Sequence, residues 1–109
     1  MKQDCKPGTM IYPLPDVMVS CGSFPEEYNI FTASWVGTIC TNPPTRYVSI
    51  RPERHSHAII KKNMEFVINI TAEGLAHDTD CYGVKSGRQF NKFEEMSLTP
   101  GKASVVVAP

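Results

Sequence analysis

The sequence has no long apolar run and no excess of charge of either sign. A membrane-spanning helix needs roughly 18 consecutive apolar residues, and no stretch of the chain approaches that length, so we expect no association with a membrane. The 11 basic and 11 acidic residues give a formal net charge of zero. This balance argues against nucleic-acid binding, which usually requires a clearly basic domain.

Closely paired cysteines and a secretion signal are also missing. None of the 4 cysteines belongs to a Cys-x-x-Cys pair, and residues 1–8 are polar, without the apolar core of a signal peptide. We therefore expect reduced thiols in a cytoplasmic protein. The histidines predict no metal site, because His55 and His57 are two residues apart and no third ligand is near them.

The length and residue pattern predict one mainly β domain. A chain of 109 residues can bury one modest core, so residues 1–109 are expected to form a single domain. β-branched and aromatic residues between turn signals predict short strands at residues 17–21, 28–32, 36–40, 47–50, 65–70 and 104–107. Helical spacing predicts short helices at residues 53–63 and 86–96, and Thr71 is a suitable N-cap for another that runs towards Asp80. Many short strands with a few short helices favour a β-barrel with helical insertions.

The predicted last strand would be an apolar edge. A barrel must close to protect its edges, and residues 104–107 would leave one exposed at Pro109. We therefore expect the barrel to be incomplete at the C-terminus.

Polar residues gather where a strand leads into the first predicted helix. Free backbone N–H groups at a helix start favour anions, and Arg51, Arg54 and the Ser56 hydroxyl add donors suited to a phosphate. Local sequence alone favours a simpler interpretation, a charged and solvent-exposed helix start.

A second basic group lies on the next predicted helix. Lys85, Arg88 and Lys92 fall on one helical face, and Ser86 can cap that helix. These cations either bind an anion or lie exposed beside neighbouring glutamates.

The chain has a single tryptophan, Trp35, which lies among small residues in the segment 32–38. Small neighbours would let the backbone run close against a flat ligand, with N–H and C=O groups free to bind its edge. A tryptophan packed in the core is the alternative, and local sequence favours it.

Together with other stretches, these features resemble the flavin reductase family, and in particular its flavoredoxin-like branch. The matching stretches occur in family order: residues 12–15 (YPLP), 29–37 (NIFTASWVG), 42–44 (NPP), 49–56 (SIRPERHS), 66–69 (FVIN) and 83–93 (GVKSGRQFNKF). The resemblance implies an FMN-binding split β-barrel that forms a homodimer. It also implies that electrons pass from NADH or NADPH through the flavin to free flavin or to a partner protein.

The resemblance also implies a set of cofactor-binding residues. The backbone of Thr32, Ala33, Ser34 and Trp35 would line the flavin ring, and Asn29 would help to position that segment. Arg51, Ser56 and Lys92 would meet the phosphate and ribityl chain, with Ser86 and Arg88 nearby. No catalytic side chain is implied, because the flavin carries the chemistry and the protein orients and shields it.

Two departures from the family pattern lie beside the implied phosphate site. The order Cys81-Tyr82-Gly83 stands where the family often has Tyr-Cys-Gly, and Asn91 stands where it often has aspartate. Family members also continue past Pro109. Two alternatives therefore remain: an electron-transfer protein that holds FMN without nicotinamide activity, and an inactive shortened chain.

Overall fold

The computed structural model describes residues 2–9, 11, 13–75, 77, 80, 92–95 and 98–109. Five strands form the described framework: β1 (Val17–Cys21), β2 (Asn29–Ala33), β3 (Val36–Cys40), β4 (Thr45–Val48) and β5 (Val67–Ile70). The helical elements whose bounds lie within the described residues are the 3-10 turns η1 (Pro25–Glu27) and η2 (Glu73–Leu75) and the α-helices α1 (His55–Asn63) and α3 (Lys92–Glu95). The expectation of a mainly β fold with short helices is confirmed.

The central strand of the larger sheet is buried on both faces. The sheet has the order β2-β1-β5, with both neighbours antiparallel to β1. Met18 on one face packs with Ile30 and Phe93, whereas Val19 on the other face packs with Phe31 and Ala33. Because successive strand side chains point to opposite faces, burial on both sides explains why β1 is an unbroken run of mostly apolar residues.

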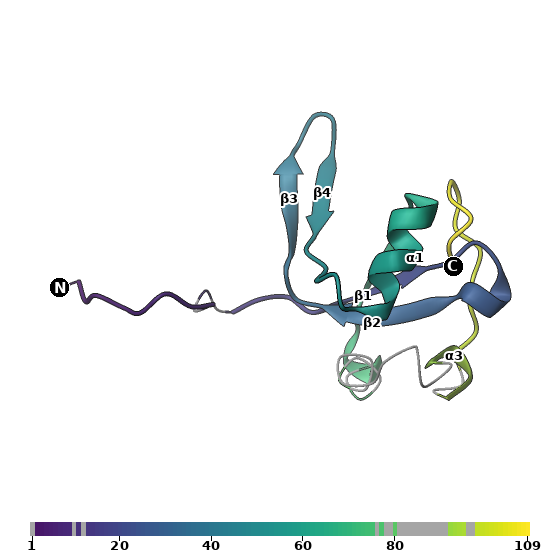
Figure 1. The fold of residues 1–109 in the computed structure, drawn as a ribbon, viewed down its shortest axis with the longest axis horizontal. Coiled ribbons are helices and arrows are strands. Elements are labelled where there is room, and N and C mark those ends of the chain that lie inside the picture. Colours follow the sequence, from purple (N-terminus) through teal and green to yellow (C-terminus); the bar gives the residue numbers. More distant parts are fainter. Residues whose placement is uncertain are drawn as a thin grey trace.

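β3 and β4 form a separate hairpin that projects from the larger sheet (Figure 1). At its base, Val36 and Val48 lie opposite each other and pack against the Val19 cluster. Further out, Gly37 pairs with Tyr47, and a Cβ at Gly37 would lie 2.7 Å from Tyr47 Cε1. Only glycine fits beneath that ring without displacing it. No described strand joins the hairpin and the three-stranded sheet into a closed barrel.

α1 is held to the turn before β2 by a single carboxylate. Glu27 accepts hydrogen bonds from the Ser23 backbone N–H and the Asn63 side-chain amide, both at 2.9 Å, and from Lys62 Nζ at 3.3 Å. These donors, with Asn63 contributing most, lower the pKa of Glu27 from its ordinary value. The end of α1 is thereby fixed beside η1.

We expect Glu27→Gln to lower the free energy of unfolding by about 1 kcal/mol at neutral pH, because the charge-assisted hydrogen bonds are weakened. A carboxyl whose pKa is depressed by folding stabilises the protein above its unfolded pKa, and this contribution is lost as the pH falls through the folded pKa. The destabilisation caused by Glu27→Gln should therefore be smaller in acid. Urea denaturation at neutral and acidic pH measures this difference.

Glu26→Gln provides the matched control, because Glu26 is an exposed neighbour in the same turn. Equal losses for the two variants at neutral pH would contradict the role assigned to Glu27.

The segment predicted as the last strand has a different structure. Residues 104–107 form bends, and Val105 is 93% exposed. The backbone N–H groups of Val107 and Ala108 both donate to Glu65 Oε1, at 2.9 and 3.0 Å, so a side chain takes the donors that a strand neighbour would have used. The prediction of a strand at 104–107 is wrong for this reason.

The remaining boundaries differ by a few residues. α1 begins at His55 and not at Glu53, β4 ends at Val48, and only residues 92–95 of the helix predicted at 86–96 are described, as α3. Within the part of the chain that the structure describes, no helix has the length and apolar character to cross a membrane.

Candidate functional site

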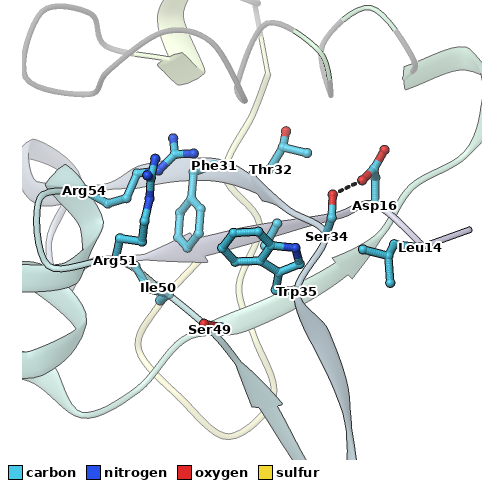
Figure 2. Close-up of a pocket in the computed structure, with 11 residues that line it drawn as sticks. Leu14, Asp16, Phe31, Thr32, Ser34, Trp35, Ser49, Ile50, Arg51 and Arg54 are labelled. Atoms are coloured by element: carbon cyan, nitrogen blue, oxygen red, sulfur yellow. Dashed lines mark hydrogen bonds between the residues drawn. The ribbon is translucent and has the colours of Figure 1, made fainter. Parts of the chain in front are cut away.

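A pocket lies where the two sheets and the start of α1 meet. Its volume is about 590 Å³, within the range of about 300–1,000 Å³ typical of small-molecule sites. Four chain segments contribute side chains, and Figure 2 shows them: Leu14 and Asp16; Phe31, Thr32, Ala33, Ser34 and Trp35; Ser49, Ile50 and Arg51; and Arg54.

Aromatic side chains form one wall of the pocket. Phe31 is 5% exposed and belongs to the core cluster with Val19. Trp35 is 44% exposed, so a large part of its indole is available to a ligand. The Ser49 backbone N–H donates to the Trp35 carbonyl at 2.9 Å, and this bond fixes the position of Trp35 relative to the segment that follows β4. The result is a partly open, flat apolar surface.

Two arginines provide positive charge at one end. The chain turns between β4 and α1, with the Arg54 N–H donating to the Arg51 carbonyl at 3.0 Å. Arg54 is the N-cap of α1 and keeps an extended backbone, with φ −69° and ψ 139°. Both guanidinium groups therefore reach the same end of the pocket (Figure 2). Arg51 Nε also lies 3.4 Å from Glu53 Oε1, an exposed pair of small energetic value.

A carboxylate occupies the other end. Asp16 precedes β1 and accepts a hydrogen bond from the Ser34 hydroxyl, drawn as a dashed line in Figure 2. The Asp16 backbone carbonyl accepts a second bond, from Thr71 Oγ1 at 2.8 Å. In the same view the Trp35 indole lies between this carboxylate and the two guanidinium groups. The pocket is thus positive at one end, negative at the other and apolar between them.

Comparison with known proteins identifies the family. The model of the flavin reductase like domain matches residues 9–109. The chain belongs to the flavin reductase-like family. An uncharacterised protein from Archaeoglobus fulgidus is 33% identical over 99 residues, which are 91% of this chain and 55% of that protein. The chain spans about half the length of the curated relatives it matches.

Solved structures share the fold of this flavin reductase-like chain. The flavoredoxin of Desulfovibrio vulgaris (Miyazaki F) superimposes with a TM-score of 0.90 at 31% identity, over 100% of this chain and 60% of that one. An FMN-binding protein from Thermus thermophilus, solved with bound 1-cyclohex-2-enone, superimposes with a TM-score of 0.75 at 27% identity, over 86% of this chain and 53% of that one. The prediction of a flavin reductase-type split barrel is confirmed.

The structure brings together half of the residues expected to bind the cofactor. Thr32, Ala33, Ser34, Trp35 and Arg51 all line the pocket. Ser86 and Arg88 lie outside the described residues.

Asn29, Ser56 and Lys92 lie elsewhere, in a buried polar cluster with Cys21. Their exposures are 4%, 1% and 3%, and none of the three is among the residues that line the pocket. Asn29 Nδ2 donates to Ser56 Oγ at 2.5 Å, which ties β2 to the first turn of α1. Contact of Ser56 and Lys92 with a phosphate therefore stays a prediction.

Burial is the main influence on Cys21 in this cluster. It raises the pKa of the thiol above its ordinary value, against the opposing effect of the hydrogen bond with Ser56. The cysteines Cys5, Cys21 and Cys40 are free thiols. Among the described residues, no group of three His, Cys, Asp or Glu side chains could hold a metal ion.

Sequence reasoning missed five of the lining residues. Leu14 lies in a stretch that matched the family, but its side chain was given no role, and Phe31, Ser49 and Ile50 resembled ordinary strand residues. Asp16 gave no signal at all, because its approach to Ser34 depends on the antiparallel pairing of β1 with β2, which places Val17 opposite Ala33.

Proposed function

We propose that this chain binds FMN in the pocket between Trp35 and the two arginines, as part of an oxidoreductase that passes electrons from NADH or NADPH to free flavin or to a partner protein. The observation that carries the proposal is the arrangement of a flat aromatic wall beside paired guanidinium groups, in a member of the flavin reductase-like family. The similarity to a flavoredoxin and to an FMN-binding protein supports it.

The residues present fit an FMN molecule in chemistry and in size. A fused aromatic ring system needs a flat apolar surface, which Trp35, Phe31 and Ile50 provide. A phosphate monoester needs charge-assisted donors, which Arg51 and Arg54 provide. The pocket volume of about 590 Å³ matches a ligand of this class.

The chain's own groups would bind and orient the cofactor. The backbone of residues 32–35 would face the ring system, and the arginines would fix the phosphate end. The apolar walls would exclude water from one face of the ring, which strengthens the electrostatic interactions nearby. The flavin, once bound, supplies hydride and electron transfer; no side chain is assigned a catalytic role.

A second copy of the chain is the proposed partner for the exposed apolar side of the hairpin. Trp35 directly precedes β3 and Ile39 lies within it, and Tyr47 of β4 pairs with Gly37 between them. The side chains of Trp35, Ile39 and Tyr47 are 44%, 65% and 46% exposed. Homodimerisation through this side would shelter these residues and the open wall of the pocket.

The first test is the visible absorption spectrum of the purified chain after addition of FMN and removal of the excess. We expect flavin bands at close to one FMN per chain, and bleaching of these bands when NADH or NADPH is added without oxygen. Size-exclusion chromatography with light scattering on the same sample measures the oligomeric state.

The outcomes separate the alternatives. Flavin that is bleached by dithionite but not by either nicotinamide nucleotide would favour a carrier that holds FMN without nicotinamide activity. A chain that remains colourless would contradict FMN binding by this chain.

A further inference from the structure

The Asp16–Ser34 pair is a feature of the pocket that flavin and phosphate binding do not explain. In the proposed function the arginine end binds the phosphate, and the aromatic wall binds the ring system. A carboxylate in the same pocket weakens the binding of any anion near it. Asp16 therefore lowers the affinity for an anionic ligand, and this loss is useful only if it discriminates between ligands.

The carboxylate is held in place from two sides. Its side chain accepts the Ser34 hydroxyl, and Ser34 is part of the segment 32–35 that lines the pocket. Its backbone carbonyl accepts Thr71 Oγ1 at 2.8 Å. Asp16 is exposed in the free chain, but the bonds at its backbone and its side chain restrict its movement when a ligand enters, so it acts on the ligand as a preorganised field.

The other charged groups of the pocket do not cancel this field at the Asp16 end. Arg51 and Arg54 reach the opposite end, and the Trp35 indole separates them from Asp16 in Figure 2. Arg51 is further balanced by Glu53 at 3.4 Å. When a ligand covers Trp35 and displaces water, the attraction and repulsion within the pocket grow stronger.

We propose that Asp16, oriented by Ser34, determines the charge specificity of the ring end of this pocket: it favours a flavin ring that is uncharged over one that carries negative charge. This inference rests on the proposed function. The oxidised ring of FMN is uncharged, whereas the reduced ring is an anion in mildly alkaline solution. Asp16 therefore makes the chain hold oxidised FMN more tightly than reduced FMN, and by linkage it favours the release of electrons.

The test measures dissociation constants for both forms of FMN with the wild-type chain and with Asp16→Asn. Asparagine keeps an oxygen that accepts the Ser34 hydroxyl, so the substitution removes charge with little change of shape. Fluorescence titration gives the constant for oxidised FMN. Anaerobic equilibrium dialysis with dithionite-reduced FMN, at low salt and mildly alkaline pH, gives the constant for the reduced form.

We expect Asp16→Asn to tighten the binding of reduced FMN relative to oxidised FMN by roughly five- to tenfold. Ser34→Ala keeps the charge but frees it to move, so it should change the same ratio in the same direction by a smaller factor. Asp4→Asn removes a carboxylate that does not line the pocket, and it should leave the ratio unchanged.

Each other outcome decides against the inference. An unchanged ratio in Asp16→Asn, or an equal weakening of both forms, would mean that Asp16 only supports the local structure. A change of similar size in Asp4→Asn would assign the effect to net charge. Binding of FMN by the wild-type chain, measured first, separates these results from failure of the proposed function, in which neither form binds.

Discussion

Replacing both Arg51 and Arg54 by alanine should weaken the binding of FMN roughly a hundredfold, while riboflavin binds within about threefold of its wild-type affinity. Riboflavin has the same ring system and ribityl chain but lacks the phosphate. Hydrogen bonds to charged groups contribute about 1.5–3 kcal/mol when well formed, and partial exposure reduces this. Two such contacts at about 1.4 kcal/mol each give the hundredfold change. Fluorescence titration with the two flavins measures it.

The chain offers a matched control for this pair. Arg46 lies on the β3–β4 hairpin, where its NH1 group donates to Thr38 Oγ1 at 2.9 Å, and it does not line the pocket. Arg46→Ala should leave both affinities unchanged. Salt should weaken FMN binding to the wild type much more than to the double variant, because the ionic contacts are screened. Equal weakening of FMN and riboflavin by the double variant would place the phosphate elsewhere.

Strand positions were the most predictable part of the fold. Residues 17–21 and 36–40 form strands with the predicted boundaries, and β2 is displaced by one residue. Each of these strands contains β-branched residues, and Gly22 directly follows β1, so the local signal agrees with the tertiary structure. At residues 104–107 the local signal fails, because the carboxylate of Glu65 binds the backbone N–H groups of Val107 and Ala108.

The resemblance to the flavin reductase family placed residues 32–35 and Arg51 in the site. Local sequence alone favours a core tryptophan and an exposed helix start at these two places. Arg54 reaches the pocket because α1 begins at the next residue, His55, so the backbone of Arg54 is still extended. Ser56 shares the same sequence motif but faces the interior, where it meets Asn29.

Residues contributed by distant segments could not be found in this way. Asp16 and Ser34 are 18 positions apart, and their contact exists only because β1 and β2 pair in a particular register. Register depends on which face of each strand is buried, and a single sequence does not determine that choice for strands as short as these. The negative end of the pocket is therefore a property of the tertiary structure.

Phe31 connects the core to the site, and Phe31→Ala should cost about 3–5 kcal/mol of the free energy of unfolding. The ring is 5% exposed and packs with Val19 and Ala33, so its removal leaves a cavity in that core cluster. The cost is a large share of the 5–15 kcal/mol that stabilises a typical protein. Urea denaturation gives the value, and Phe24→Ala is the control, because Phe24 is 46% exposed and should cost about 1 kcal/mol or less.

Phe31→Leu separates the two roles of this residue, because leucine retains enough apolar volume for the chain to fold. Phe31→Leu should lower the free energy of unfolding by about 1–1.5 kcal/mol. A ligand present at a hundred times its dissociation constant stabilises the folded state by about 2.7 kcal/mol, so saturating FMN should raise the wild-type midpoint clearly. If Phe31 forms part of the flavin surface, the same FMN concentration should stabilise Phe31→Leu less than the wild type. An equal increment would mean that Phe31 supports the core alone, and that the ring system rests on Trp35 without it.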